Sequence, residues 1–329
     1  MLWHSIFGVA VFFSAFIALI TNLMWLVAWC ICLLFGYHLP YAPFGWTTVA
    51  LVAIEWAFFA YGHHIGRFKS EVTEEVFVSN EIPESFDGYR IVHISDFHVD
   101  SFDKPGHLER LIEKINDQHP DIILFTGDIV SSTLEKAREQ EKALSSLSAK
   151  DGVVSVLGNH DFFIYDHRFD SDEERSAEAD CLARFEGENL GWKVLRNESF
   201  LLHRGADSIA IAGVDNINGD QGFHTIQKGD LKSALKNLDG IFAVLLTHDP
   251  SHWKAEVLPE SNVQLTLSGH THAAQVRLFG WSLANLMFKE CDGRYECNGR
   301  MLYVNAGLGG VVPFRIGCPS EITVITLRR

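Results

Sequence analysis

The sequence predicts an α/β domain of mixed sheets covered by helices, preceded by helices that cross a membrane. Three observations predict this architecture. The first 66 of the 329 residues contain no Lys or Arg and a single acid, Glu55. From Val72 onward, short β-branched runs alternate with stretches of helical composition, as in sheets covered by helices. Asp, Asn and His residues follow five of these runs, so the chemistry collects at strand ends.

The N-terminal part is expected to be a retained membrane anchor of two or three helices. Residues 2–36 carry no formal charge, and this run exceeds the roughly 20 residues that one spanning helix needs. The pair Thr21-Asn22 leaves open one long tilted helix or two helices joined by a tight turn. His38–Gly45 is expected to be a loop and Trp46–Gly62 a second apolar segment. A cleavable signal peptide fits poorly, because no basic region precedes the long apolar run.

Charge along the chain indicates the orientation of the anchor. Glu55 is costly in lipid unless it faces a partner helix or lies near an interface. Arg67 and Lys69 directly follow the second apolar segment, whereas the N-terminus and the loop have neither Lys nor Arg. The positive-inside tendency then predicts that the following domain faces the cytoplasm. We expect residues 1–66 to form the anchor and residues 67–329 the second domain.

Composition limits the partners and the redox chemistry. All 27 basic residues and 41 of the 42 acids lie in residues 67–329, which gives that part a net charge of −14. Nucleic acid is not an expected partner, because its binding depends on basic patches. Cys30 and Cys32 lie in the apolar N-terminal part, and of the other four cysteines only Cys291 and Cys297 lie near one another. A small disulfide loop and two reduced thiols both stay open there, and reduced thiols are favoured.

Eight short apolar runs are predicted to be strands, and four stretches between them are predicted to be helices. The strands are Arg90–Ile94, Ile122–Phe125, Val153–Leu157, Ile209–Gly213, Phe242–Leu246, Val263–Leu267, Leu302–Asn305 and Ile322–Leu327. The helical stretches are His107–Asp117, Thr133–Leu147, Asp172–Gly187 and Lys228–Leu238.

Five of the predicted strands run directly into polar motifs rich in metal-ligand residues. The motifs are Ser95-Asp96-Phe97-His98, Thr126-Gly127-Asp128, Gly158-Asn159-His160-Asp161, Thr247-His248-Asp249 and Ser268-Gly269-His270-Thr271-His272. Sites in open α/β sheets form beyond the carboxyl ends of strands, so these side chains are expected to converge. Taken singly, an Asp after a strand is usually a turn or cap residue. Five such ends in order favour a metal site instead.

These motifs, in this order, resemble those of the calcineurin-like metallophosphoesterases. The chain from about Val72 to its end is similar to the membrane-anchored bacterial branch of that superfamily, with supporting segments at Val194–Asn197, Ile211–Gly213 and Leu302–Gly309. The resemblance implies a four-layer α-β-β-α sandwich and a multi-pass protein of the bacterial inner membrane. The motif set is specific for the superfamily and not for a substrate.

The resemblance also implies a site for two divalent metal ions. One ion would be held by Asp96, His98 and His272, the other by Asn159, His248 and His270, and Asp128 would bridge both. Carboxylate and imidazole suit Mn, Fe or Zn, and the neutral amide of Asn keeps the site from becoming too anionic for a phosphate. Such a pair clamps phosphoryl oxygens and generates a bridging hydroxide, which would attack phosphorus in line.

His160 is the candidate general acid, because it neighbours Asn159 and imidazole titrates near pH 7. A structural histidine behind the ligands is the alternative. Asp161 either orients His160 or braces the loop. Two positions depart from the family pattern: Ser131 stands where many relatives have Asp, and Ala273-Ala274 stands where close relatives often have Gly-Gly, which predicts a tighter or less open turn.

The favoured function is a di-metal phosphodiesterase or pyrophosphatase acting at a membrane. Its substrate would be a phospholipid or a lipid-linked compound such as UDP-diacylglucosamine. One alternative is a nucleotide or cyclic-nucleotide phosphodiesterase with an incidental anchor, and another is a non-catalytic membrane metal-binding scaffold. Phe162–Tyr165 is either core or an apolar lip for an acyl chain. Arg315 is either a surface residue or a phosphate contact.

Overall fold

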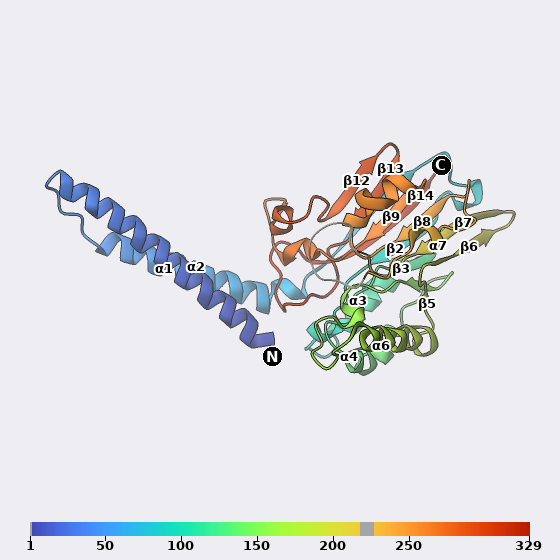
Figure 1. The fold of residues 1–329 in the computed structure, drawn as a ribbon, viewed down its shortest axis with the longest axis horizontal. Helices are drawn as coiled ribbons and strands as arrows, with labels where there is room; N and C mark the ends of the chain where they lie inside the picture. Colours follow the sequence, from blue (N-terminus) through green and yellow to red (C-terminus); the bar gives the residue numbers. More distant parts are fainter. Residues whose placement is uncertain (1, 218–226) are drawn as a thin grey trace. The chain divides into compact units, whose positions relative to one another are not determined.

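The computed structural model describes residues 2–217 and 227–329, with side chains described from residue 7 onward. The chain divides into two compact units (Figure 1). The first contains Met1–Arg67 and the short segment Val312–Ile316. The second contains Phe68–Val311 and Gly317–Arg329. Each unit is described by itself.

Two antiparallel helices, α1 (Leu2–Leu34) and α2 (Ala42–His64), make up most of the first unit (Figure 1). The helix α1 continues through Thr21, whose hydroxyl donates to the carbonyl of Ile17 at 2.9 Å. The two-helix interpretation of this run is therefore wrong. Both α1 and α2 are long and apolar enough to cross a membrane, judged by length and composition.

Polar side chains join the two helices at several levels. The Ser14 hydroxyl donates to Glu55 Oε2 at 2.7 Å, and the Trp56 indole N–H donates to the Ser14 oxygen at 3.0 Å. The hydroxyls of Thr21 and Thr48 lie 2.6 Å apart. Glu55 therefore faces the partner helix, the arrangement that makes an acid tolerable in an apolar segment.

The segment Val312–Ile316 packs against the C-terminal end of α2. The rings of Phe59 and Phe314 lie 5.2 Å apart, and a Cβ on Gly62 would come within 2.5 Å of the Phe314 ring. The Arg315 backbone N–H donates to the Gly62 carbonyl at 3.2 Å, and its side chain is only 2% exposed. The interpretation of Arg315 as a surface residue is therefore wrong.

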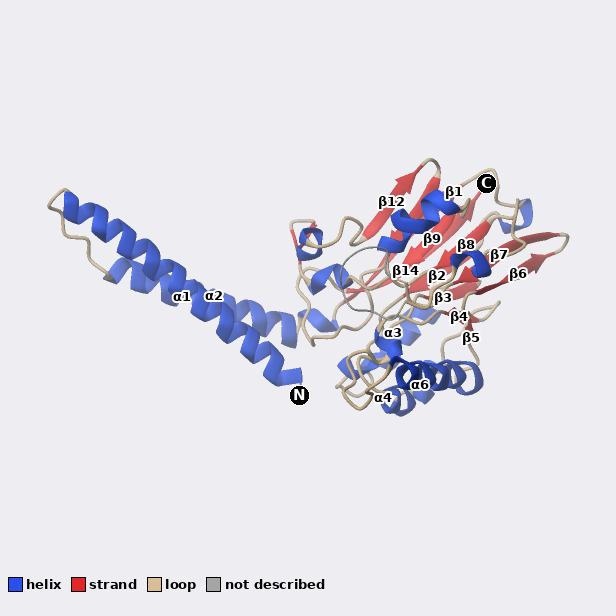
Figure 2. Ribbon diagram, in the orientation of Figure 1, coloured by secondary structure: helices blue, strands red, loops and turns tan. Residues whose placement is uncertain are grey.

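The second unit contains two six-stranded sheets among its described residues (Figure 2). The first sheet has the order β1 (Ser70–Val78), β14 (Ser320–Arg328), β2 (Arg90–Ile94), β3 (Ile122–Phe125), β4 (Val153–Ser155), β5 (Lys193–Val194). The second has the order β12 (Gly293–Cys297), β13 (Arg300–Val304), β9 (Leu265–Ser268), β8 (Ala243–Leu246), β7 (Asp207–Gly213), β6 (Glu198–Arg204). Each sheet combines parallel and antiparallel pairs, so both are mixed.

Alternating apolar residues place each sheet between two hydrophobic layers. In β3, Ile122 and Leu124 enter the core between the sheets, whereas Ile123 and Phe125 enter the core beneath the helices. That outer core is covered by α3 (His107–Asn116), α4 (Leu134–Glu139), α5 (Glu141–Leu144) and α6 (Asp172–Arg184). On the second sheet, α7 (Leu231–Ala234) and α8 (Leu258–Glu260) cover the outer face. The predicted four-layer α-β-β-α sandwich is confirmed.

Local pattern located the central strands better than the edges. All eight predicted strands are present within a few residues, but β1, β5, β6 and β12 were not predicted. Each of these four lies at the edge of its six-stranded sheet, where polar residues are tolerated, and β1 and β12 carry several charges. The predicted helix Lys228–Leu238 is reduced to the single turn α7. The cysteines are free thiols, so Cys291 and Cys297 are not bridged.

Candidate metal centre

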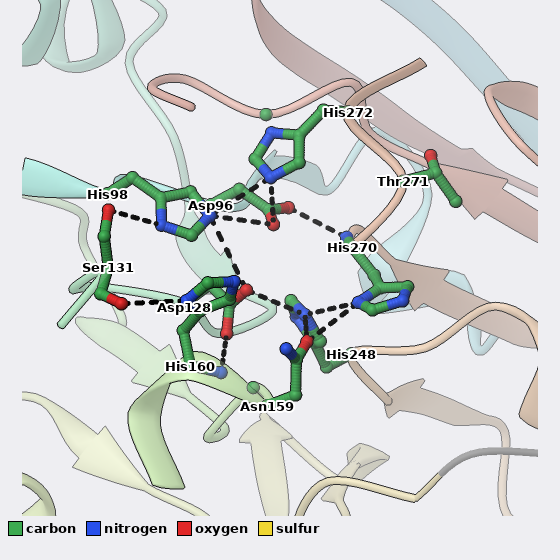
Figure 3. Close-up of polar contacts among 12 residues, drawn as sticks. Asp96, His98, Asp128, Ser131, Asn159, His160, His248, His270, Thr271 and His272 are labelled. Carbon is green, nitrogen blue, oxygen red and sulfur yellow. Dashed lines mark hydrogen bonds and ion pairs between the residues drawn. The ribbon is translucent and has the colours of Figure 1, made fainter. Parts of the chain in front are cut away.

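The five polar motifs lie beyond the carboxyl ends of β2, β3, β4, β8 and β9, and their side chains meet in one place (Figure 3). The backbone is strained there. Positive φ values occur at Asp96, His98, Asp128, His270 and His272. A non-glycine residue in this left-handed region costs about 1 kcal/mol or more, and such strain is concentrated at functional sites.

The first cluster of ligand-type atoms is formed by Asp96, His98 and His272, all buried. The Nε2 atoms of His98 and His272 lie 3.1 Å apart. Asp96 Oδ1 lies 3.3 Å from His272 Nε2 and is buried without a hydrogen-bond donor among the described residues. A buried carboxylate oxygen without a donor is costly unless a cation compensates its charge.

The second cluster is formed by Asn159, His248 and His270. Asn159 Oδ1 lies 2.8 Å from His270 Nδ1 and 3.0 Å from His248 Nε2. The two imidazole nitrogens are 3.2 Å apart. Three atoms with lone pairs thus converge on a point that suits a borderline divalent ion.

Asp128 lies between the two clusters (Figure 3). Its Oδ2 is 3.2 Å from His248 Nε2 and 3.6 Å from His98 Nε2, so one carboxylate oxygen is shared. Its Oδ1 accepts the backbone N–H of His160 at 2.9 Å. This is the arrangement expected of a carboxylate that bridges two ions.

Backbone and hydroxyl groups fix the orientation of the imidazoles. His248 Nδ1 lies 2.7 Å from the Thr126 carbonyl, and because a carbonyl only accepts, Nδ1 carries the proton and Nε2 faces the centre. His98 Nδ1 lies 3.1 Å from the Ser131 hydroxyl, and His98 Nε2 faces the centre. On the far side of His270, Nε2 is 3.8 Å from Asp249 Oδ2. Sequence reasoning assigned no role to Thr126 or Asp249.

The electrostatics of the centre favour a cation. Burial lowers the pKa of His98 well below its usual value, so this imidazole is a neutral ligand. Burial also opposes a charge on His248, but the Asp128 and Asp96 carboxylates and the Thr126 carbonyl together outweigh it and raise the pKa of His248 to about 10. A positive charge beside Asp128 is therefore stabilised, and a divalent ion provides it. The residues present fit two divalent ions.

Two glycines allow the loops to approach closely. A Cβ on Gly158 would lie 2.2 Å from Asp128 Oδ1, and one on Gly269 would lie 2.3 Å from Asp96 Oδ2. Any side chain at either position would displace a carboxylate of the centre. The glycines of the Gly-Asn-His-Asp and Gly-His-x-His motifs are thus required by space rather than by a turn.

A sequence profile of the calcineurin-like phosphoesterase family matches residues 89–274. The chain belongs to this family. As a family member it is a metal-dependent phosphoester hydrolase, a class that uses a di-metal centre.

Relatives of this phosphoesterase occur in bacteria and animals. An uncharacterized metallophosphoesterase, YkuE of Bacillus subtilis, is 30% identical over 279 residues, which cover 82% of this chain and 90% of the relative. The UDP-2,3-diacylglucosamine pyrophosphatase LpxG of Chlamydia muridarum is 28% identical over 72% of this chain and 83% of its own. A zebrafish transmembrane protein with a metallophosphoesterase domain is 30% identical over 76% of this chain and 55% of its own. Among solved structures, a dimetal phosphatase from zebrafish aligns over 69% of this chain and 90% of its own, with 14% identity and a TM-score of 0.43.

In this phosphoesterase His160 lies at the open side of the centre. Its Nδ1 donates to the Ser131 carbonyl at 2.9 Å, so a backbone group orients the imidazole. Its ring lies 4.8 Å from the His98 ring and 4.5 Å from the Tyr165 ring. Asp161 does not contact the imidazole. It accepts the backbone N–H groups of Asp128 at 2.7 Å and of Gly158 at 2.9 Å, so it braces the loop.

The stretch Phe162–Tyr165 is mainly core. Phe162 and Phe163 are buried in the core beneath the helices, so they do not form a lip for an acyl chain. Tyr165 is exposed and packs on His160. Tyr165 follows the short helix His160–Phe162, which the sequence pattern did not predict.

The phosphoesterase makes its turn after His272 with two alanines in the left-handed region, at φ 49° for both Ala273 and Ala274. Ala274 is exposed, so replacing it removes little packing. We expect Ala274→Gly to raise the free energy of unfolding by about 0.5–1 kcal/mol, because glycine adopts this conformation without strain. Urea unfolding of the full chain in detergent measures it. As a control, Ala177→Gly at an exposed position inside α6 should lower stability by about 1 kcal/mol. An unchanged Ala274→Gly variant would contradict the strain argument.

Proposed function

We propose that this protein is a di-metal phosphodiesterase or pyrophosphatase that acts at a membrane on a phospholipid or a lipid-linked substrate such as UDP-diacylglucosamine. The position of Asp128 is the observation that supports this class of reaction. One of its carboxylate oxygens, Oδ2, lies within 3.6 Å of imidazoles from both clusters. This oxygen is shared between the two clusters. It suits a centre that holds two cations side by side.

The seven proposed ligands form two sets, one for each of two ions of Mn, Fe or Zn. Asp96, His98 and His272 would hold one ion, Asn159, His248 and His270 would hold the other, and Asp128 would hold both. Only Asp96 and Asp128 of this set are anionic, so two divalent ions leave the centre with a net charge of +2, which favours an anionic phosphoester. A bound pair of ions supplies Lewis acidity toward phosphoryl oxygens and lowers the pKa of water held between them.

His160 completes the reaction as general acid. Its Nδ1 proton is held by the Ser131 carbonyl, so Nε2 is the nitrogen that can deliver a proton to the leaving oxygen. The ring is partly exposed, which leaves room for a leaving group beside it. Asp161 fixes the backbone of Asp128 and Gly158 and takes no part in proton transfer.

The membrane assignment rests on the first unit. We assign residues 1–66 as the anchor and residues 67–329 as the phosphoesterase domain. Two crossings place the N-terminus and the domain on the same side, and Arg67 and Lys69 favour the cytoplasmic face of a bacterial inner membrane. Similarity to LpxG supports a lipid-linked pyrophosphate as substrate, because LpxG is a UDP-2,3-diacylglucosamine pyrophosphatase.

A substrate panel tests the proposal. The full chain, stripped of metal and given Mn²⁺, is offered UDP-diacylglucosamine in mixed micelles, a cyclic nucleotide, bis(p-nitrophenyl) phosphate and p-nitrophenyl phosphate. We expect metal-dependent turnover, with kcat/KM highest for the lipid pyrophosphate. Preference for the cyclic nucleotide would favour the nucleotide phosphodiesterase. Two ions bound per chain without turnover of any substrate would favour a non-catalytic scaffold.

A further inference from the structure

A short hairpin directly after the candidate metal centre exposes an unusual number of large apolar side chains. It is formed by β10 (Arg277–Leu278) and β11 (Trp281–Ser282) and continues into the turn Leu283–Leu286. We call residues 277–287 the apolar hairpin. Its exposed apolar side chains are Leu278, Phe279, Trp281, Leu283, Leu286 and Met287. So many large apolar groups gathered within ten residues mark a surface that contacts something other than water.

The tip of the apolar hairpin is strained. Phe279 and Gly280 form its two-residue turn, with φ values of 53° and 81°, and Phe279 is fully exposed. A turn with positive φ at both positions is usually built from Asn-Gly or Asp-Gly. A phenylalanine there adds backbone strain and gains no burial within the chain. Folding stability therefore does not account for Phe279, and a function of its ring outside the fold does.

The apolar hairpin is joined to the metal centre. It follows the turn that begins at His272, and at its end Phe288 packs edge-on against His270 with ring centroids 5.8 Å apart. Residues 285–290, together with Lys254 and Tyr295, line a cavity of about 570 Å³ on this side. Leu286, Met287 and Phe288 line this cavity beside the Lys254–Glu290 ion pair, and Phe288 connects the apolar hairpin to a proposed metal ligand.

The charge of this segment fits a lipid surface. Between Gln275 and Lys289 the sequence contains no acidic residue, although residues 67–329 carry a net charge of −14. Of the two basic residues, Arg277 is paired with Asp292 at 2.7 Å, while Lys289 is exposed. Apolar and Trp side chains flanked by a cation and free of acids are typical of segments that enter the interface of a bilayer, whose anionic headgroups repel carboxylates.

We propose that the apolar hairpin inserts into the surface of the bilayer that holds α1 and α2. Phe279 and Trp281 enter the headgroup region, and a lipid substrate reaches the metal centre along Phe288 without passing through water. This inference rests on the membrane attachment in the proposed function, but it does not depend on which phosphoester is cleaved.

Trp281 provides a direct test. The full chain is placed in nanodiscs of phosphatidylcholine and phosphatidylglycerol with or without bromine on the acyl chains, and tryptophan quenching is compared between the wild type and Trp281→Phe. The wild type minus the variant isolates Trp281, and we expect this difference signal to be quenched at least two-fold. The tryptophans of α1 and α2 report separately on insertion of the anchor. Quenched anchor tryptophans with an unquenched Trp281 would overturn the hairpin proposal alone. If neither is quenched, the membrane attachment itself is wrong and both proposals fail.

Phe279→Asn removes the ring and leaves the fold intact, because Asn-Gly suits this turn better than Phe-Gly. We expect unchanged hydrolysis of soluble bis(p-nitrophenyl) phosphate, an unfolding free energy equal to or above that of the wild type, and at least a halving of Trp281 quenching by bromolipid. Leu201→Asn, which removes an exposed apolar residue from β6, is the control and should change neither the hydrolysis of the soluble ester nor the quenching of Trp281. If Trp281 stays unquenched and Phe279→Asn instead converts a dimer in detergent into a monomer, the hairpin binds a second copy and the proposal is overturned.

Discussion

Asp128→Asn is expected to lower kcat for bis(p-nitrophenyl) phosphate by about 10³-fold or more at saturating Mn²⁺. The amide removes one of the two negative charges of the proposed ligand set. Its N–H₂ group also replaces an oxygen that lies 3.2 Å from His248 and 3.6 Å from His98. We expect the variant to retain less than two ions per chain, measured by elemental analysis after gel filtration.

The control for this variant is Asp207→Asn, which changes a partly exposed carboxylate at the start of β7 that accepts the Ser85 backbone N–H at 3.1 Å. Its kcat and metal content should match those of the wild type. An Asp128→Asn enzyme with two ions and wild-type kcat would show that this carboxylate does not bridge, and the ligand assignment would then be wrong.

His160→Asn is expected to lower kcat by about 10²–10³-fold for substrates whose leaving group must be protonated, and far less for p-nitrophenyl esters. The reason is that a good leaving group departs as an anion and needs no acid. Metal content should remain at the wild-type level, because the seven proposed ligands are intact. The measurement uses a series of aryl phosphodiesters with leaving groups of increasing basicity. In the variant, log kcat should fall more steeply with the pKa of the leaving group than in the wild type.

Tyr165→Phe is the matched control, since it keeps the ring that packs on His160 and removes only the hydroxyl. It should leave the slope unchanged. Loss of one ion from His160→Asn, with an equal loss of rate for all leaving groups, would instead make His160 a metal ligand. This outcome is worth measuring because His160, His98 and Asp128 lie close enough together to share a metal ion.

Local sequence patterns predict much of the site. Apolar runs that end in Gly, Asp, Asn and His located β2, β3, β4, β8 and β9 within about two residues. The structure brings all seven predicted ligands together, because the parallel neighbours within each sheet point their carboxyl ends the same way. The glycines beside the ligands also follow from this packing, since a Cβ at Gly158 or Gly269 would overlap a carboxylate.

The remainder depends on groups whose identity the sequence does not reveal. The carbonyls of Ser131 and Thr126 orient His160 and His248, and a carbonyl is the same in every residue type. The burial of individual side chains was equally hard to predict from residue type. Arg315 is enclosed despite its charge, whereas Phe279 is fully exposed despite its apolar ring.

The sequence by itself determined the family, the order of the ligand motifs and the apolar character of the first 66 residues. Each of these depends on residue type and short-range spacing, and both persist in the unfolded chain. Only the tertiary structure decided that Asp128 lies between two clusters, that Asp161 braces a loop and that an apolar hairpin stands exposed beside His270. These are distances between segments far apart in the chain, and they exist only once the two sheets have packed against each other.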